Sequence, residues 1–263
     1  MLGSGPLSNF FLQMLRVAIA LGAAAGAGET ACAQQKVGST AAVINDVTRE
    51  LAGAASPLKA GDSVFRDELV RTAEASKAKL IFLDSTNLVV GPSSQVTLDE
   101  FVYSGPTAAA NAQKLEVSLT KGVFRFTTGT LDKKAYLIST PNSSIALRGT
   151  VLDIDVRAGL SRVTLREGRA LVCPRRPGVA FERQERNCGN TAGARPAPGC
   201  DCVELNAPGQ TAQVTTIGGV NRASLSSRPV DFASVCAGAA GSLCAAQGYA
   251  SAAGFPRGAL CGH

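Results

Sequence analysis

The sequence is poor in aromatic residues and has almost no histidine, and both shortages limit the chemistry open to it. It contains no Trp, three Tyr and one His, which is the terminal His263. A core without Trp must be built mainly from Val, Leu, Ile and Ala. Sugar-binding faces usually stack sugar rings on aromatic side chains, so the composition disfavours glycan binding. A Ser–His catalytic pair would have to use the chain terminus.

Sequence motifs of common enzymes and nucleic-acid-binding proteins are missing as well. The chain has no G-x-x-x-x-G-K-[ST], no G-x-G-x-x-G on a strand-to-helix turn, no G-x-S-x-G and no D-x-D-x-D-G calcium loop. The net charge is +6, but the richest basic stretch, residues 175–186, also carries Glu182 and Glu185. No DNA- or RNA-binding motif accompanies it. We predict a non-enzymatic protein with no cofactor, no metal site and no nucleic-acid partner.

Acidic side chains are the remaining candidates for acid–base chemistry. Asp153 and Asp155 lie two residues apart on one predicted strand and therefore share a face. Alternating acids are typical of the solvent-exposed face of a half-buried strand, so we favour this structural interpretation over catalysis. The candidate carboxylates are Asp84, Asp99, Glu100, Asp153 and Asp155.

The N-terminus has the pattern of an export signal. Arg16 precedes an uncharged apolar run over 17–28, and Ala31-Cys32-Ala33 fits the small-x-small cleavage rule, with the cut between Ala33 and Gln34. The run is shorter than the ~20 residues of a membrane-spanning helix. We predict that residues 1–33 are a cleaved signal peptide, whether translation starts at Met1 or Met14. Lipid attachment at Cys32 is the less favoured alternative. The mature chain is expected in the bacterial periplasm or secreted, with no transmembrane helix left.

The cysteines agree with export. Cys32 leaves with the signal, and the other seven of the eight all follow residue 172. Clustered cysteines in an oxidising compartment favour disulfides, whereas zinc would need paired C-x-x-C spacing or more histidine. Cys173 ends one predicted strand and Cys202 begins the next, which favours Cys173–Cys202 and Cys188–Cys200, although four cysteines allow three connectivities. The last three would form one pair and one odd thiol, and the candidates for that pair are Cys236 and Cys244.

Short alternating apolar segments dominate residues 40–172. Two runs, LIFL and LVV, flank the turn residues 84–87, and Leu115, Val117 and Leu119 alternate with polar neighbours. Only residues 67–79 are moderately helical in pattern. We predict an all-β antiparallel sandwich or jelly-roll-like domain. It would include a Cys/Pro/Arg-rich insertion at 173–202, returning strands at 203–220, and a weakly ordered Ala/Gly/Cys tail at 221–263.

Segments such as LKAGDSVFRD, ISTPNSSIALRGTVLDIDV and VTLREGRALV, spread over residues 58–172, contain a series of turn-forming dipeptides. In their order, these segments resemble the periplasmic domain of the FecR family. The resemblance implies an envelope domain without catalytic activity. The best-known members carry a cytoplasmic anti-sigma segment and a membrane helix, where this chain has a predicted signal. The matching residues are Gly61-Asp62, Gly91-Pro92, Gly122, Thr140-Pro141, Arg148-Gly149-Thr150 and Glu167-Gly168.

Arg148-Gly149-Thr150 is the polar motif with two interpretations. Arg148 would capture an anion or peptide terminus, or Gly149 would permit an unusual backbone angle while Thr150 caps it. We favour the structural role. For the protein as a whole, we expect a binding or interaction module with an unknown protein or envelope ligand. The alternatives are a component of a sigma-factor-type signalling pathway, acting through separate membrane partners, and a glycan-binding protein.

Overall fold

The computed structural model describes residues 34–103, 113–188, 200–237 and 243. The predicted signal peptide, residues 1–33, lies outside these residues. The described chain is mostly β-strand, and its strands form one continuous, mainly antiparallel sheet of 17 strands. This confirms the predicted fold class. Among the described residues, no helix is both long enough and apolar enough to cross a membrane.

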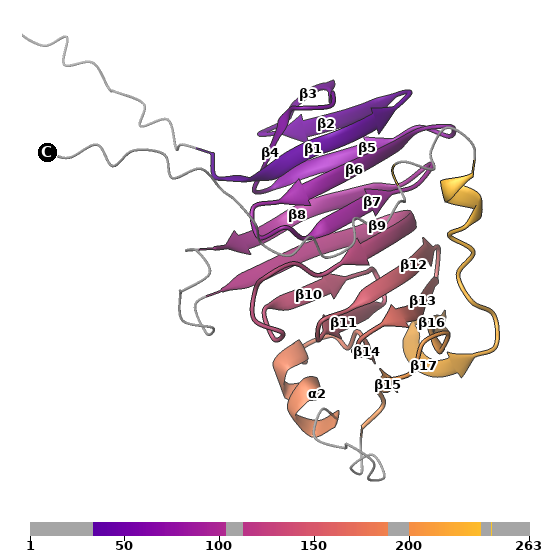
Figure 1. Ribbon diagram of the computed structural model, residues 1–263. Coiled ribbons are helices and arrows are strands. Elements are labelled where there is room, and N and C mark those ends of the chain that lie inside the picture. The colour runs from indigo at the N-terminus through magenta and orange to yellow at the C-terminus, as the bar shows by residue number, and fades with distance from the viewer. Residues whose placement is uncertain (1–33, 104–112, 189–199, 238–242, 244–263) are drawn as a thin grey trace, which may run out of the picture. The chain divides into compact units, whose positions relative to one another are not determined.

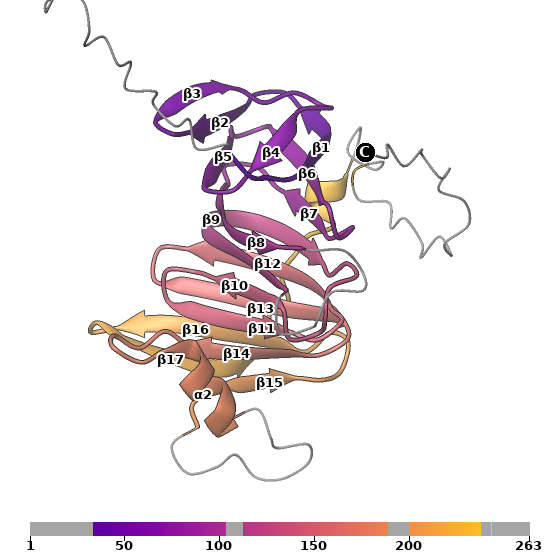
Figure 2. The same ribbon diagram turned by 90° about the vertical axis from the view of Figure 1, so that its left-hand side faces the viewer.

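The sheet divides into two ladders that face each other across one core (Figures 1 and 2). We call them layer A and layer B. Layer A runs in the order β4 (Ser63–Phe65), β1 (Lys36–Ile44), β6 (Lys77–Phe82), β7 (Asn87–Val90), β9 (Lys114–Thr127), β12 (Val151–Arg157), β13 (Leu160–Glu167), β16 (Thr211–Ile217) and β17 (Val220–Ser226). Layer B runs in the order β3 (Ala54–Pro57), β2 (Val47–Leu51), β5 (Glu68–Thr72), β8 (Gln95–Val102), β9, β10 (Tyr136–Ser139), β11 (Ser143–Leu147), β14 (Ala170–Pro174) and β15 (Val203–Leu205).

Strand β9 belongs to both layers. Its first half pairs with β8 and, in parallel, with β10, and its second half pairs with β7 and β12. The change of layer occurs at Gly122, which has φ +111°. A Cβ on Gly122 would lie 2.0 Å from the Ser94 hydroxyl oxygen, which accepts a hydrogen bond from the Val123 N–H (3.1 Å). The crossing therefore requires glycine.

Alternate residues of both layers fill the core. Phe126 of β9 meets Tyr136 of β10 edge-on, with 6.3 Å between ring centroids. Most of the other buried side chains are aliphatic, as the composition requires. The bulkiest fully buried side chains are Phe101, Phe124, Phe126, Phe232, Leu58, Leu80, Leu88, Leu98, Leu115, Leu119, Ile138 and Ile145.

Three segments differ from the sequence-based expectation. Residues 67–79 form β5 and the start of β6, because alternate residues of β5 bury against the core. The insertion at 173–202 contains a helix, α2 (Phe181–Cys188). The returning strands continue past residue 220 through β17, which pairs with β16 along its whole length.

The chain after β17 lies on the outer face of layer A. We call residues 228–236 the strap; it ends in the short 3-10 helix η2 (Ser234–Cys236). The Val230 N–H donates to the Thr164 hydroxyl of β13 (2.8 Å), and Lys77 of β6 donates to the Val235 carbonyl. Between these ends, Phe232 is fully buried and packs with Val89 of β7. The strap thus crosses layer A from β13 to β6 (Figure 1).

Candidate functional site

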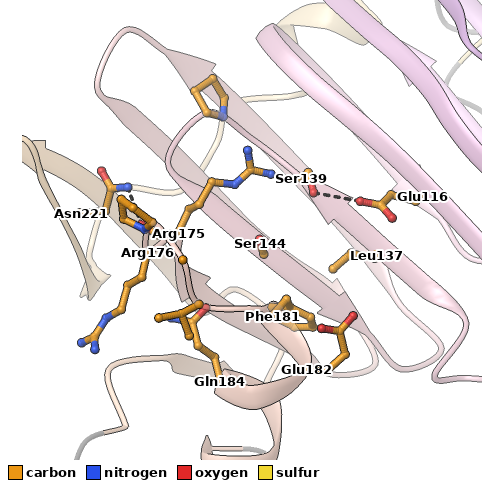
Figure 3. A pocket seen from close by; sticks show the side chains of 14 residues that line it. Glu116, Leu137, Ser139, Ser144, Arg175, Arg176, Phe181, Glu182, Gln184 and Asn221 are labelled. Carbon is orange, nitrogen blue, oxygen red and sulfur yellow. Dashed lines mark hydrogen bonds between the residues drawn. The ribbon is translucent and has the colours of Figure 1, made fainter.

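A pocket of about 540 Å³ lies on the outer face of layer B, beneath α2 and the segment before it (Figure 3). Its floor comes from β9, β10 and β11, and its walls come from α2, residues 175–179 and β17. The size lies within the range of small-ligand sites. The lining residues are Glu116, Leu137, Ser139, Pro141, Ser144, Arg175, Arg176, Pro177, Gly178, Val179, Phe181, Glu182, Gln184 and Asn221.

The floor is polar because strand alternation turns core residues inward and these residues outward. Leu115 and Val117 of β9 are fully buried, so Glu116 between them faces the pocket. Glu116 accepts a hydrogen bond from the Ser139 hydroxyl (3.4 Å) and pairs with the Lys114 ammonium (3.2 Å). The floor therefore offers a carboxylate held in a fixed position.

The wall opposite Glu116 carries Arg175, which forms no salt bridge with a described residue. The backbone of Arg175 is held at both ends: its N–H donates to the Asn142 carbonyl (2.8 Å) and its carbonyl accepts from the Asn221 amide (2.7 Å). Within the described part of the chain, its guanidinium makes no hydrogen bond or ion pair. Arg176 differs, because it pairs with Asp201 (2.6 Å). Figure 3 shows the Arg175 side chain extending across the pocket in the direction of Ser139.

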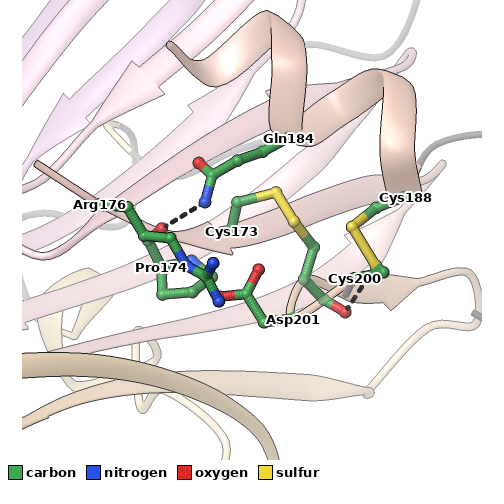
Figure 4. Close-up of a disulfide and its surroundings, with 8 residues drawn as sticks. Cys173, Pro174, Arg176, Gln184, Cys188, Cys200 and Asp201 are labelled. Carbon is green, nitrogen blue, oxygen red and sulfur yellow. Dashed lines mark hydrogen bonds and ion pairs between the residues drawn. A yellow bond between two sulfur atoms is a disulfide. The ribbon is translucent and has the colours of Figure 1, made fainter. Parts of the chain in front are cut away.

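Two disulfides fix helix α2 over the pocket. They join Cys173 to Cys202 and Cys188 to Cys200, the two pairs favoured from the sequence (Figure 4). Gln184 of α2 is buried and donates to the carbonyl of Pro174 (3.0 Å), which follows Cys173 in β14. The wall of the pocket is therefore tied covalently to layer B.

The other cysteines are only partly described. Cys236, in the strap, also belongs to a disulfide. Cys244 and Cys261 lie outside the described residues, so the predicted pair Cys236–Cys244 stays a prediction. The sulfurs of Cys188, Cys200 and Cys202 lie within 4.8 Å of one another. Because all three are in disulfides, they offer no thiolate to a metal.

Asp153 and Asp155 share the outer face of β12, as predicted, but that face is not solvated. Both side chains are buried, and Asp153 accepts from Arg125 (2.6 and 3.0 Å) and Arg166 (2.6 Å). The Arg125 guanidinium in turn lies 4.5 Å from the Phe232 ring centroid, under the strap. The expectation of a solvent-exposed face was wrong for these acids, since the strap and arginines cover them.

The remaining acids have separate environments. Asp84 is buried in the β6–β7 turn, where it accepts from Thr86 (2.6 Å) and the Tyr136 hydroxyl (2.9 Å). Burial, and the charge of Asp84, raise the pKa of Tyr136 well above its usual range. Glu100 pairs with Lys114 (2.7 Å). Burial raises the pKa of Asp99, one of whose carboxylate oxygens has no hydrogen-bond partner.

Comparison with protein families gives a match over the centre of the chain. Residues 68–171 match the family model described as FecR protein. This segment therefore resembles a FecR domain. It spans β5 to β14 and thus includes the pocket floor and most of both layers, whereas Gly61 and Asp62 precede it. The match confirms the resemblance seen in the sequence.

Two solved structures are distantly similar to this chain. Two crystal structures from Parabacteroides distasonis, both described as a candidate anti-sigma factor, are 11% identical in sequence, with TM-scores of 0.40 and 0.39. Each match covers 60% of this chain, and the chain spans 59% of the length of those proteins. No protein of curated function matches the chain.

Two FecR motifs pack directly on each other. Gly149 has φ +68° and Gly168 has φ +81°. A Cβ on Gly168 would lie only 1.8 Å from the Gly149 carbonyl oxygen. Thr150 fixes the turn, because its hydroxyl accepts from the Arg148 N–H (2.9 Å) and donates to the Arg169 carbonyl (2.8 Å). These contacts support the structural interpretation of Arg-Gly-Thr.

The Arg148 side chain lies away from the pocket. It is exposed and pairs with Glu185 of α2 at 3.5 Å. The arginine that faces the pocket is Arg175, which the sequence analysis noted only as part of a basic stretch. No local motif marks it, because Arg175, Glu116 and Ser139 come from three separate parts of the chain.

The other FecR motifs support turns. Thr140 begins a buried network in which the Ser161 hydroxyl lies 2.9 Å from the Thr140 hydroxyl and donates to the Asn142 side-chain oxygen (2.6 Å), and the Asn142 amide donates to the Val214 carbonyl (3.0 Å). This network joins the layer B turn that includes Pro141 to layer A. Asp62, after Gly61, accepts from the Lys59 N–H (2.8 Å). At Gly91-Pro92, a Cβ on Gly91 would lie 2.6 Å from the Val123 carbonyl oxygen.

Proposed function

We propose that the protein is an exported, non-enzymatic binding module of the bacterial cell envelope, and that the pocket over layer B is its ligand site. The FecR match supports a signalling-related envelope protein. The observation that carries the binding role is the pocket itself, a polar cavity on a rigid sheet with a disulfide-stapled helix as its wall. Rigid walls with a few fixed polar groups are what a binding site needs. The proposal includes removal of residues 1–33 at export.

The side chains around the pocket favour binding over catalysis. A serine nucleophile needs a neighbouring base that is itself oriented by a third group. The only carboxylate that accepts from Ser139 is Glu116, at the long distance of 3.4 Å, and Glu116 is also paired with Lys114. Within the described ranges there is no histidine, and no hydrogen bond joins Ser144 of the pocket to a base. These groups suit ligand recognition by hydrogen bonds and charge.

A second candidate function is signalling through separate membrane partners. The FecR match is the observation that favours it. In this case the ligand of the pocket would be a segment of a sigma-pathway membrane protein. Glycan binding has no such support, since Phe181 is the one aromatic residue among those that line the pocket.

Site-specific photo-cross-linking tests the proposed function. A photoreactive amino acid replaces Leu137 on the pocket floor, and a matched control places it at the exposed Glu167 at the end of β13. We expect envelope adducts from position 137 that position 167 does not give. Sigma-pathway membrane proteins among those adducts would favour the signalling role. Identical adducts from both positions, or none from position 137, would overturn the pocket as the ligand site.

A further inference from the structure

We propose that the pocket binds the carboxyl terminus of an extended peptide, with Arg175 as the carboxylate-binding residue. This inference rests on the proposed function, in which the pocket is the ligand site. It assigns the chemical class of the ligand from the charges and apolar surfaces that line the cavity.

Arg175 is suited to bind a carboxylate because its backbone is fixed while its guanidinium remains available. Its backbone is anchored on both sides by Asn142 and Asn221, while its guanidinium has no hydrogen bond or ion pair to any described residue. A guanidinium donates two parallel N–H bonds to one carboxylate. Its neighbour Arg176 is engaged with Asp201. The pocket therefore has one cation available, which suits a ligand with a single negative group.

The opposite side of the pocket requires a ligand that donates hydrogen bonds. Glu116 forms part of the floor, and Asp99 and Glu100 of β8 lie on the same face of layer B. Burial is the main cause of the raised pKa of Asp99, and repulsion from Glu116 adds to it. A hydrogen bond from Ser118 and the charge of Arg175 oppose the shift. A ligand with several negative charges would be repelled by this acidic side. A peptide carries one terminal carboxylate and main-chain N–H donors, which match Arg175 and Glu116 respectively.

The apolar part of the lining provides room for side chains. Leu137 lies on the floor, and Pro141, Pro177, Val179 and Phe181 also line the pocket. These mostly aliphatic and proline surfaces suit an apolar peptide side chain, whereas a sugar-binding site would need more flat aromatic surface than Phe181 alone provides. A volume of about 540 Å³ accommodates the last few residues of a peptide.

Defined peptides test the inference on the oxidised mature chain. The probes are acetyl-Ala-Leu-Ala with a free carboxylate and the same peptide as its amide, titrated by isothermal calorimetry or by NMR. We expect the acid to bind at least ~10-fold more tightly than the amide. Arg175→Gln should abolish this preference. Arg183→Gln, on the exposed side of α2 and outside the pocket lining, is the matched control and should keep it. Circular dichroism of Arg175→Gln checks that the variant folds.

Other results would overturn the ligand class. Equal affinity for the peptide acid and the peptide amide, or an unchanged preference in Arg175→Gln, would show that Arg175 does not bind the peptide carboxylate. Tighter binding of inorganic phosphate or glucuronate than of the peptide acid would assign the pocket to another anion. If position 137 still gives specific envelope adducts, any of these results leaves the binding module standing. Loss of those adducts as well would overturn the proposed function too.

Discussion

At the scale of single residues, Gly168 explains why the Arg-Gly-Thr and Glu-Gly motifs occur together. Gly168 has no room for a Cβ, because the carbonyl oxygen of Gly149 occupies that space. Gly209 provides a comparison: it has a similar φ of +86°, but a Cβ there would have no neighbour within 4 Å. Alanine substitutions at the two positions can therefore distinguish the energy of placing a side chain on a left-handed backbone from the energy of a steric clash with a neighbouring group.

We predict that Gly168→Ala destabilises the protein much more than Gly209→Ala does. Both substitutions place an L-residue at positive φ, which costs about 1–2 kcal/mol. Only Gly168→Ala also forces the Arg-Gly-Thr turn to move, which adds about 2 kcal/mol or more. Urea unfolding of the two variants measures the difference in the free energy of unfolding. Equal losses would show that the contact between the motifs is unimportant.

The buried side chain of Glu68 makes the stability of the folded protein depend on pH. One of its oxygens accepts from Arg49 (2.7 Å) and the Phe65 N–H (2.8 Å), and the other has no partner. Burial raises the pKa of Glu68 above its ordinary value of 4.5, even though Arg49 opposes the shift. The folded protein therefore retains a proton that the unfolded chain releases. This contribution to stability is present below pH 4.5 and is lost as the pH rises through the higher folded pKa.

We predict that Glu68→Gln removes this pH dependence. The amide cannot ionise, so the variant should gain stability relative to the parent as the pH rises above 4.5. The measurement is the free energy of urea unfolding from about pH 4 to about pH 8. Glu50→Gln is the matched control for loss of a carboxylate in an arginine pair, because Glu50 is half exposed in its pair with Arg71. A curve for Glu68→Gln that runs parallel to that of the parent would contradict the prediction.

Expectations for single residues were correct where local backbone geometry determines the residue's role. They failed where segments that are distant in the sequence come together in the fold. The need for glycine at 149 was predictable, because a turn requires positive φ. Alternation also showed that Asp153 faces outward. It did not show that Phe232, nearly eighty positions later in the chain, would help cover that face. For the same reason, the sequence offered only Arg148 as a possible anion-binding residue, with a structural role favoured, and did not show that Arg175 would line the pocket.

At the scale of elements, the disulfides make α2 a stable wall. The helix has eight residues, and most of its side chains are polar or charged. Helices this short are marginal in water unless tertiary contacts hold them. The two disulfide pairs were predictable from the ends of neighbouring strands, whereas the helix inside the insertion was not. Its apolar side chains are only Phe181 and Cys188, one at each end, so tertiary contacts must hold the helix. Phe181 packs against the apolar cluster that contains Leu171, and the disulfides and the Gln184 bond to Pro174 complete the anchoring.

We predict that replacing Cys188 and Cys200 together by Ser releases α2 and leaves the sandwich folded. The Cys188–Cys200 disulfide closes a loop with a sequence separation of 12, and its loss should lower the free energy of unfolding by up to about 3 kcal/mol on the chain-entropy model. Trypsin should then cut faster at Arg183 and Arg186, while far-ultraviolet circular dichroism keeps its β signal. Replacing the Cys173–Cys202 pair is the comparison, and it should also loosen β15. An unchanged rate of cleavage in α2 would mean that the disulfide does not hold the wall.

At the scale of the whole described molecule, the two layers have different outer faces. Layer B leaves an open pocket beside α2, whereas the strap crosses the corresponding face of layer A. The sequence predicted the layered all-β architecture, because alternation and turns are local signals. It also predicted a weakly ordered tail from residue 221, where the structure has β17 and the strap. Three widely spaced apolar residues, Val230, Phe232 and Val235, bury the strap, and such spacing gives no strand or helix pattern.

We predict that Phe232→Ala detaches the strap from layer A. The substitution empties a fully buried site and removes the ring that lies 4.5 Å from Arg125, so we expect a loss of about 3 kcal/mol in the free energy of unfolding. Hydrogen exchange of residues 228–236 should become fast, while β10 and β11 of layer B keep their protection. Leu225→Ala, at a side chain that is 63% exposed, is the control and should change stability by less than about 0.5 kcal/mol. If exchange in the strap stays slow in Phe232→Ala, the disulfide at Cys236 and the bond from Lys77 must hold the strap without the buried ring.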